Sequence, residues 1–193
     1  MAETQTDRVQ ADPGSDRGLP GNILIWILIV SEFLVFVAAL AGFAGARILA
    51  PDVFRAGVSH LSPLAGSVNT AILLTSGLCA ALALEASDSG RKRLASRWLA
   101  AAALIGAGFV VVKILEYAAK IRLGLTIDTD NFFTLYYLIT GFHLAHVIFG
   151  VLLFLLVAVW PSRDNVRSVT MFWHLVDLIW VMVFPVIYLT GNS

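Results

Sequence analysis

One uninterrupted apolar stretch limits what this chain can fold into more than any other feature. Residues 132–160 run for 29 positions without an Asp, Glu, Lys or Arg. A helix rises about 1.5 Å per residue, so a helix of this length exceeds the roughly 30 Å hydrocarbon core of a bilayer. The stretch therefore predicts a transmembrane helix that is tilted or extends into the headgroup layer.

Two histidines, His143 and His146, are the strongly polar side chains near the middle of this stretch. Three residues turn a helix by about 300°, so both imidazoles point to the same side. Hydrocarbon offers no hydrogen bonds, and we therefore expect these side chains to meet polar groups on neighbouring helices.

The rest of the chain repeats this apolar character. Of the 193 residues, 59% are hydrophobic and 13% are charged, with a formal net charge of zero. A typical soluble domain has about 25% charged residues. No segment alternates apolar and polar residues as an outer-membrane strand does, so the pattern predicts an all-α membrane protein with five transmembrane helices. The apolar segments are residues 23–49, 64–84, 94–121, 132–160 and 169–189.

The charged residues outside these segments predict how the chain is oriented. Residues 1–21 carry charges and no apolar core, so we expect a disordered cytoplasmic tail, not a cleavable signal peptide, before a transmembrane domain at 22–193. Eight Lys and Arg residues lie on the side of the N-terminus, and four lie on the opposite side. The positive-inside rule therefore places the N-terminus in the cytoplasm and the C-terminus in the periplasm.

The first segment contains one carboxyl group, Glu32, about ten residues inside it. A carboxylate at that depth is unfavourable unless it is neutral or paired. Two interpretations remain open at this point. Glu32 either joins two helices through a hydrogen bond, or it takes part in proton handling or lipid binding.

The third segment ends in a group of ionisable residues. Lys113, Glu116, Tyr117 and Lys120 are spaced by three and four positions and share one face of a helix. Glu116 precedes Lys120 by four residues, which is the favourable order for an ion pair within a helix. The pattern predicts a structural ion cluster near the outer membrane boundary, where long basic side chains can reach the interface.

The fifth segment has a second polar pair, His174 and Asp177, again three residues apart. Such a pair can bind a proton, orient an imidazole or hold two helices together. We predict that Asp177, Glu32 and either His143 or His146 form one polar cluster between the first, fourth and fifth helices, because each would otherwise lack a partner in hydrocarbon.

The residues do not predict a catalytic centre, a metal site or a surface for nucleic acid. His143 and His146 reach the same side of one helix and cannot ligate a single haem iron from both faces. A b-type cytochrome of two histidine ligands would have to use one of them with His174, which lies nearer the inner surface. That cytochrome, and a small proton-coupled transporter that uses Glu32, are the alternative functions.

The order of the polar motifs resembles that of subunit III of the haem–copper cytochrome c oxidases, from residue 21 onward. The last two motifs, read in that order and spacing, are highly specific. The matching residues are Trp26, Ser31, Glu32 and Phe36; residues 68–71 (VNTA); Glu116 and Tyr117; residues 140–147 (TGFHLAHV); and residues 173–180 (WHLVDLIW).

Some features depart from the usual pattern of that family. The chain has the five-span form, which lacks the first two helices of the seven-span form. Lys113 stands where respiratory members usually have Gln. Residues 132–137 and 184–189 are similar to the NorE-type protein of bacterial nitric oxide reductase systems.

The resemblance implies an accessory subunit of an electron transport complex in the bacterial inner membrane. Such a subunit binds no redox cofactor, because haem and copper belong to the partner subunit. The implied partners are a catalytic haem–copper oxidase or nitric oxide reductase subunit and membrane phospholipid. Glu32 matches the family's buried, reactive carboxyl, whose surroundings include lipid.

Overall fold

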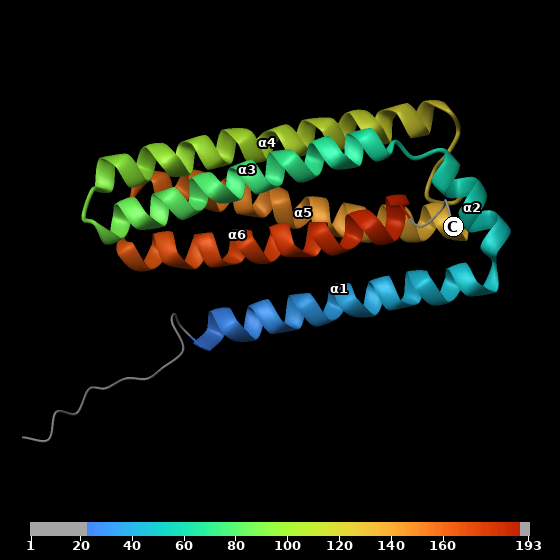
Figure 1. Cartoon of the computed structure of the whole chain (residues 1–193), viewed down its shortest axis with the longest axis horizontal. Helices are drawn as coiled ribbons and strands as arrows, with labels where there is room; N and C mark the ends of the chain where they lie inside the picture. Colours follow the sequence, from blue (N-terminus) through green and yellow to red (C-terminus); the bar gives the residue numbers. More distant parts are fainter. Residues whose placement is uncertain (1–22, 190–193) are drawn as a thin grey trace, which may run out of the picture.

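The computed structural model describes residues 23–189, and the expected tail at 1–21 lies outside them. The described chain consists of helices joined by short connecting segments and contains no strand (Figure 1). Its elements are α1 (Ile23–Leu49), α2 (Pro51–Ser59), α3 (Pro63–Asp88), α4 (Lys92–Arg122), α5 (Asn131–Val159), α6 (Arg163–Phe184) and a π-helical turn, η1 (Pro185–Leu189).

Five of the helices in this described part are long and apolar enough to cross a membrane, which confirms the predicted five-span bundle. Helices α3, α4 and α6 extend beyond the predicted apolar segments. The reason is that a helix can continue with polar side chains once it leaves the hydrocarbon. Three helix starts are capped by side chains: Ser62, Asp130 and Ser162 accept hydrogen bonds from backbone N–H groups of the first turns of α3, α5 and α6.

The short helix α2 was not predicted, because it is too short to show an apolar period. It begins at Pro51, a residue suited to the first position of a helix because no backbone N–H is needed there. Phe54 of α2 is buried and packs edge-on against Phe43 of α1 and Phe132 of α5. Helix α2 thus fixes the end of α1 to the rest of the bundle.

Helices α3, α4, α5 and α6 form a four-helix bundle, and α1 lies along its side against α5 and α6 (Figure 1). At the centre of the bundle is Trp173, which is fully buried. A Cβ placed on Gly106 or Gly150 would lie 2.7 Å or 2.6 Å from the Trp173 ring. Glycine at both positions therefore makes the space that this indole occupies.

Helix α6 ends in the turn η1 at Pro185. Proline has no N–H to donate to the preceding turn, so the α-helical hydrogen-bond pattern changes there. The turn buries Tyr188 and directs its hydroxyl to Lys113 of α4. The end of the last helix therefore contributes to a polar cluster inside the bundle.

Candidate functional site

Glu32 of α1 and His146 of α5 meet between these helices, where Oε2 of Glu32 lies 3.1 Å from Nε2 of His146. Their side chains are 23% and 15% exposed. The structure therefore brings together two members of the predicted cluster. This contact is a polar link between α1 and the four-helix bundle.

The geometry of His146 determines that this pair holds a proton. Nδ1 of His146 lies 2.9 Å from the backbone oxygen of Phe142, which can only accept, so Nδ1 carries a hydrogen. Nε2 of a neutral imidazole then has no hydrogen, and a bond to Glu32 requires a proton between the two atoms. Either a neutral carboxylic acid donates to Nε2, or an imidazolium donates to a carboxylate. In both states the pair has no net charge and one exchangeable proton.

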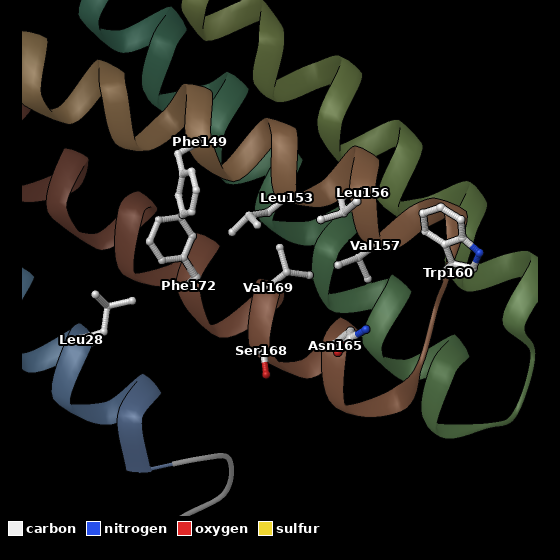
Figure 2. Close-up of a pocket in the computed structure, with 10 residues that line it drawn as sticks. All are labelled: Leu28, Phe149, Leu153, Leu156, Val157, Trp160, Asn165, Ser168, Val169 and Phe172. Atoms are coloured by element: carbon white, nitrogen blue, oxygen red, sulfur yellow. The ribbon is translucent and has the colours of Figure 1, made fainter.

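A cavity of about 570 Å³ lies between α1, α5 and α6 (Figure 2). Its walls are mostly apolar. At one end are Leu28, one helical turn before Glu32, and Phe172, whose ring stacks on His146 with centroids 6.4 Å apart. At the other end lie polar or amphipathic side chains, Trp160, Asn165 and Ser168.

The second histidine of α5, His143, does not join the pair. It is buried beside the Trp180 ring, with centroids 5.2 Å apart, and Phe109 lies edge-on at 5.5 Å. Neither ring nitrogen has a hydrogen-bond partner within residues 23–189. Of the two histidines, only His146 meets Glu32 in this described part of the chain.

Asp177 was predicted to lie with Glu32, and this prediction was wrong. Its carboxyl faces α3, where a Cβ on Gly77 would lie 2.4 Å from Oδ2. Phe172, five residues earlier in α6, contacts His146. Five residues rotate a helix by about 140° net, so Asp177 points to a different side of α6. His174 remains beside Asp177, with 3.8 Å between Nδ1 and Oδ2.

The predicted ion cluster of α4 is present and buried. Glu116 accepts from Lys113 at 3.0 Å and from Lys120 at 2.9 Å. Tyr136 of α5 and Tyr188 of η1 add hydroxyl groups that also contact Glu116. These two tyrosines were missed because they come from other elements. The cluster contains two ammonium groups and one carboxylate.

Tyr117 shares the face of the ion cluster but has a different hydrogen-bond partner, the Thr140 hydroxyl of α5, at 2.7 Å.

Within residues 23–189, no group of three or more His, Cys, Asp or Glu side chains is placed to hold a metal ion.

The chain is similar to known proteins over most of its length. The sequence model of the family described as cytochrome c oxidase subunit III matches residues 13–192. Cytochrome c oxidase subunit 3 of Corynebacterium diphtheriae is 30% identical over 173 residues, which cover 84% of each chain. The protein of the same name from Synechocystis is 29% identical, over 92% of this chain and 81% of its own. Cytochrome bo(3) ubiquinol oxidase subunit 3 of Pseudomonas aeruginosa is 34% identical, over 64% of this chain and 63% of its own.

Proposed function

This chain belongs to the cytochrome c oxidase subunit III family, and we propose that it supports proton uptake and sustained turnover in a catalytic haem–copper subunit beside it. Membership makes it a multi-pass protein of the inner membrane and an accessory, non-catalytic subunit of an oxidase complex. The proposal goes further, because it assigns a role to particular residues.

The observation that carries the proposal is the Glu32–His146 pair. A pair that holds one exchangeable proton inside the membrane can pass a proton on if it accepts one from one side and releases its own to the other, and its net charge is then the same before and after. With the N-terminus in the cytoplasm, as the distribution of Lys and Arg favours, Glu32 lies on α1 about 15 Å from the cytoplasmic end of its helix. Protons taken up by an oxidase arrive from that side.

A membrane phospholipid is the ligand we propose for the cavity between α1, α5 and α6. Apolar walls suit acyl chains, and the polar end at Trp160, Asn165 and Ser168 suits a headgroup (Figure 2). Acyl chains in this cavity would cover the Glu32–His146 pair and keep bulk water away from its proton.

Nitric oxide reductase is a second candidate partner, and the resemblance of residues 132–137 and 184–189 to the NorE-type protein is the reason to consider it. The features that set this chain apart from respiratory members are Lys113 and the ending at residues 184–189. These two features meet, because Lys113 Nζ donates to the Tyr188 hydroxyl. The partner of a NorE-type subunit would act in denitrification.

The test is purification of the complex with and without this chain. We expect the catalytic subunit to co-purify, to have an unchanged haem spectrum, and to lose activity faster during turnover when this chain is absent. Whether the purified complex reduces oxygen or nitric oxide then distinguishes the two candidate partners. Equal rates, pH profiles and lifetimes with and without the chain would contradict the proposal.

A stoichiometric Soret band from the isolated chain would instead favour the autonomous b-type cytochrome, and proton-coupled uptake by vesicles of the isolated chain would favour a transporter.

A further inference from the structure

A second groove, between α3 and α6, carries two polar side chains that the proposed function does not use. His174 has 50% of its side chain exposed, and Asp177 beside it has 8% exposed. The groove encloses about 410 Å³. Its opposite wall consists of small and apolar residues of α3, namely Leu74, Gly77, Leu78 and Ala81.

This polar pair lies near the middle of the membrane. Asp177 is roughly 21 Å along α6 from Arg163, and roughly 18 Å from Leu189 at the other end. Gly77 is at a similar depth on α3, roughly 21 Å from Pro63. Both positions are therefore surrounded by hydrocarbon unless protein covers them.

The pair does not satisfy its own hydrogen bonds. His174 Nδ1 and Asp177 Oδ2 are 3.8 Å apart, which is beyond hydrogen-bond distance. Asp177 Oδ1 is buried and has no hydrogen-bond partner within residues 23–189. Oδ2 lies over Gly77, on the side that opens into the groove. Lipid chains cannot form hydrogen bonds with either group, so a polar partner is favoured at this place.

The wall of α3 is suited to another helix. Gly77 and Ala81 are four residues apart, and Ala81 is exposed. Small residues at this spacing allow the backbone of a second transmembrane helix to approach closely. The groove therefore combines room for a helix with polar atoms that such a helix could bond.

We propose that a transmembrane helix of the catalytic subunit packs into this groove and hydrogen-bonds to His174 and Asp177. The side chain that it contributes would be a hydroxyl or an amide, because these groups both donate and accept. A second carboxylate is disfavoured by repulsion from Asp177. This inference rests on the proposed accessory role and names the surface through which that role is exercised.

The first test is site-directed photo-crosslinking in membranes that contain the whole complex. Photoreactive residues replace Leu78 and Leu178, which flank the groove and are 61% and 51% exposed. The matched control replaces Leu104 of α4, which is 77% exposed and also near mid-membrane. We expect adducts with the catalytic subunit from Leu78 and Leu178, and none from Leu104.

The other outcomes separate this inference from the accessory role. Adducts with a second copy of this chain, adducts with lipid alone, or adducts of the catalytic subunit from Leu104 only would overturn the docking site. If the catalytic subunit still co-purifies in those cases, the accessory role stands. If it is absent from every preparation, both proposals are overturned.

Substitutions in the groove give an independent measurement. His174→Leu removes the exposed imidazole without disturbing a buried position, and we expect recovery of the catalytic subunit to fall about threefold to tenfold. Asp177→Asn keeps a hydrogen-bonding group and should recover more of the catalytic subunit than Asp177→Leu does. The control Leu104→Ala should have no effect. Full recovery with His174→Leu, in a chain whose thermal unfolding is unchanged, would contradict the docking site.

Discussion

At the scale of single residues, the two histidines of α5 show how much a helical position matters. His146 bonds to Glu32 and to the backbone of Phe142, whereas His143 is surrounded by aromatic rings. The two histidines are three residues apart, and both have apolar neighbours in the sequence. One of them belongs to a proton-holding pair, and the other fills the core.

Substitution of Glu32 tests that pair. Glu32→Gln should assemble almost as well as the wild type, because the amide N–H can donate to Nε2 of His146. Glu32→Ala leaves Nε2 without a donor and should lower the stability of the complex by about 1–2 kcal/mol. The measurement is thermal unfolding of the purified complex. Both variants lack the exchangeable proton, so both should shorten the period of sustained turnover.

Equal loss of stability in the two variants would show that the hydrogen bond does not matter. A matched control is Ser31→Ala, since Ser31 is exposed and, within residues 23–189, bonds to the carbonyl of Leu28 in its own helix.

The ion cluster of α4 gives a second prediction at this scale. Glu116→Gln leaves Lys113 and Lys120 buried without a counter-ion and should destabilise the protein by about 3–5 kcal/mol. Lys113→Met leaves one balanced pair and should be milder. The double variant retains one unpaired ammonium instead of two, so it should unfold at a temperature between those of the single variants.

The same thermal measurement decides this order. If Glu116→Gln proves no more harmful than Lys113→Met, charge balance is not what keeps the cluster stable.

At the scale of helices, packing depends on glycines, which leave room for large side chains of neighbouring helices. Trp173 of α6 reaches α4 at Gly106 and α5 at Gly150, so one indole joins its own helix to two others. The turn η1 has a similar effect at the C-terminal end of α6, because it brings Tyr188 to the ion cluster. Helix α6 is thus the element against which the others are positioned.

Alanine at Gly150 tests this packing. The added Cβ would lie 2.6 Å from the indole ring of Trp173, so Gly150→Ala should destabilise the bundle by about 1–3 kcal/mol. Gly42→Ala is the matched control, because a Cβ at that position of α1 has no atom within 4 Å. The control should be neutral or slightly stabilising, since alanine favours a helix over glycine. Similar unfolding temperatures for the two variants would argue against a tight glycine contact at Trp173.

At the scale of the whole molecule, α1 is not one of the four bundle helices but lies along the side of the bundle, in contact with α5 and α6 (Figure 1). The Glu32–His146 pair and the cavity of Figure 2 both lie between α1 and these helices. The groove with His174 lies between α3 and α6 instead. The proposed site for a proton and lipid and the proposed docking surface for a protein partner therefore lie on different parts of the molecule.

The orientation of the molecule can be tested with reporter fusions. With five spans and the N-terminus inside, a green fluorescent protein fused to the C-terminus should be dark, and alkaline phosphatase fused there should be active. A phosphatase fused after Gly90, between α3 and α4, should be inactive. The opposite pattern would place Glu32 nearer the periplasm and remove its proposed role in cytoplasmic proton uptake.

The five spanning helices could be predicted from the sequence alone, because the bilayer imposes length and apolarity on each segment separately. So could the Lys113–Glu116–Lys120 group, since those contacts lie within one helix. A polar group at Glu32 that needs a partner could likewise be predicted from its depth alone.

The sequence could not predict which side chains from different helices meet, and the packed bundle shows this. Glu32 pairs with His146 and not His143, Asp177 faces α3, and Tyr188 reaches Glu116. These contacts depend on how far each helix is rotated toward its neighbours. Segments that are apolar on all sides contain little information about rotation, because no polar face marks the direction of the solvent. Rotation is set instead by packing, such as that of Trp173 against two glycines.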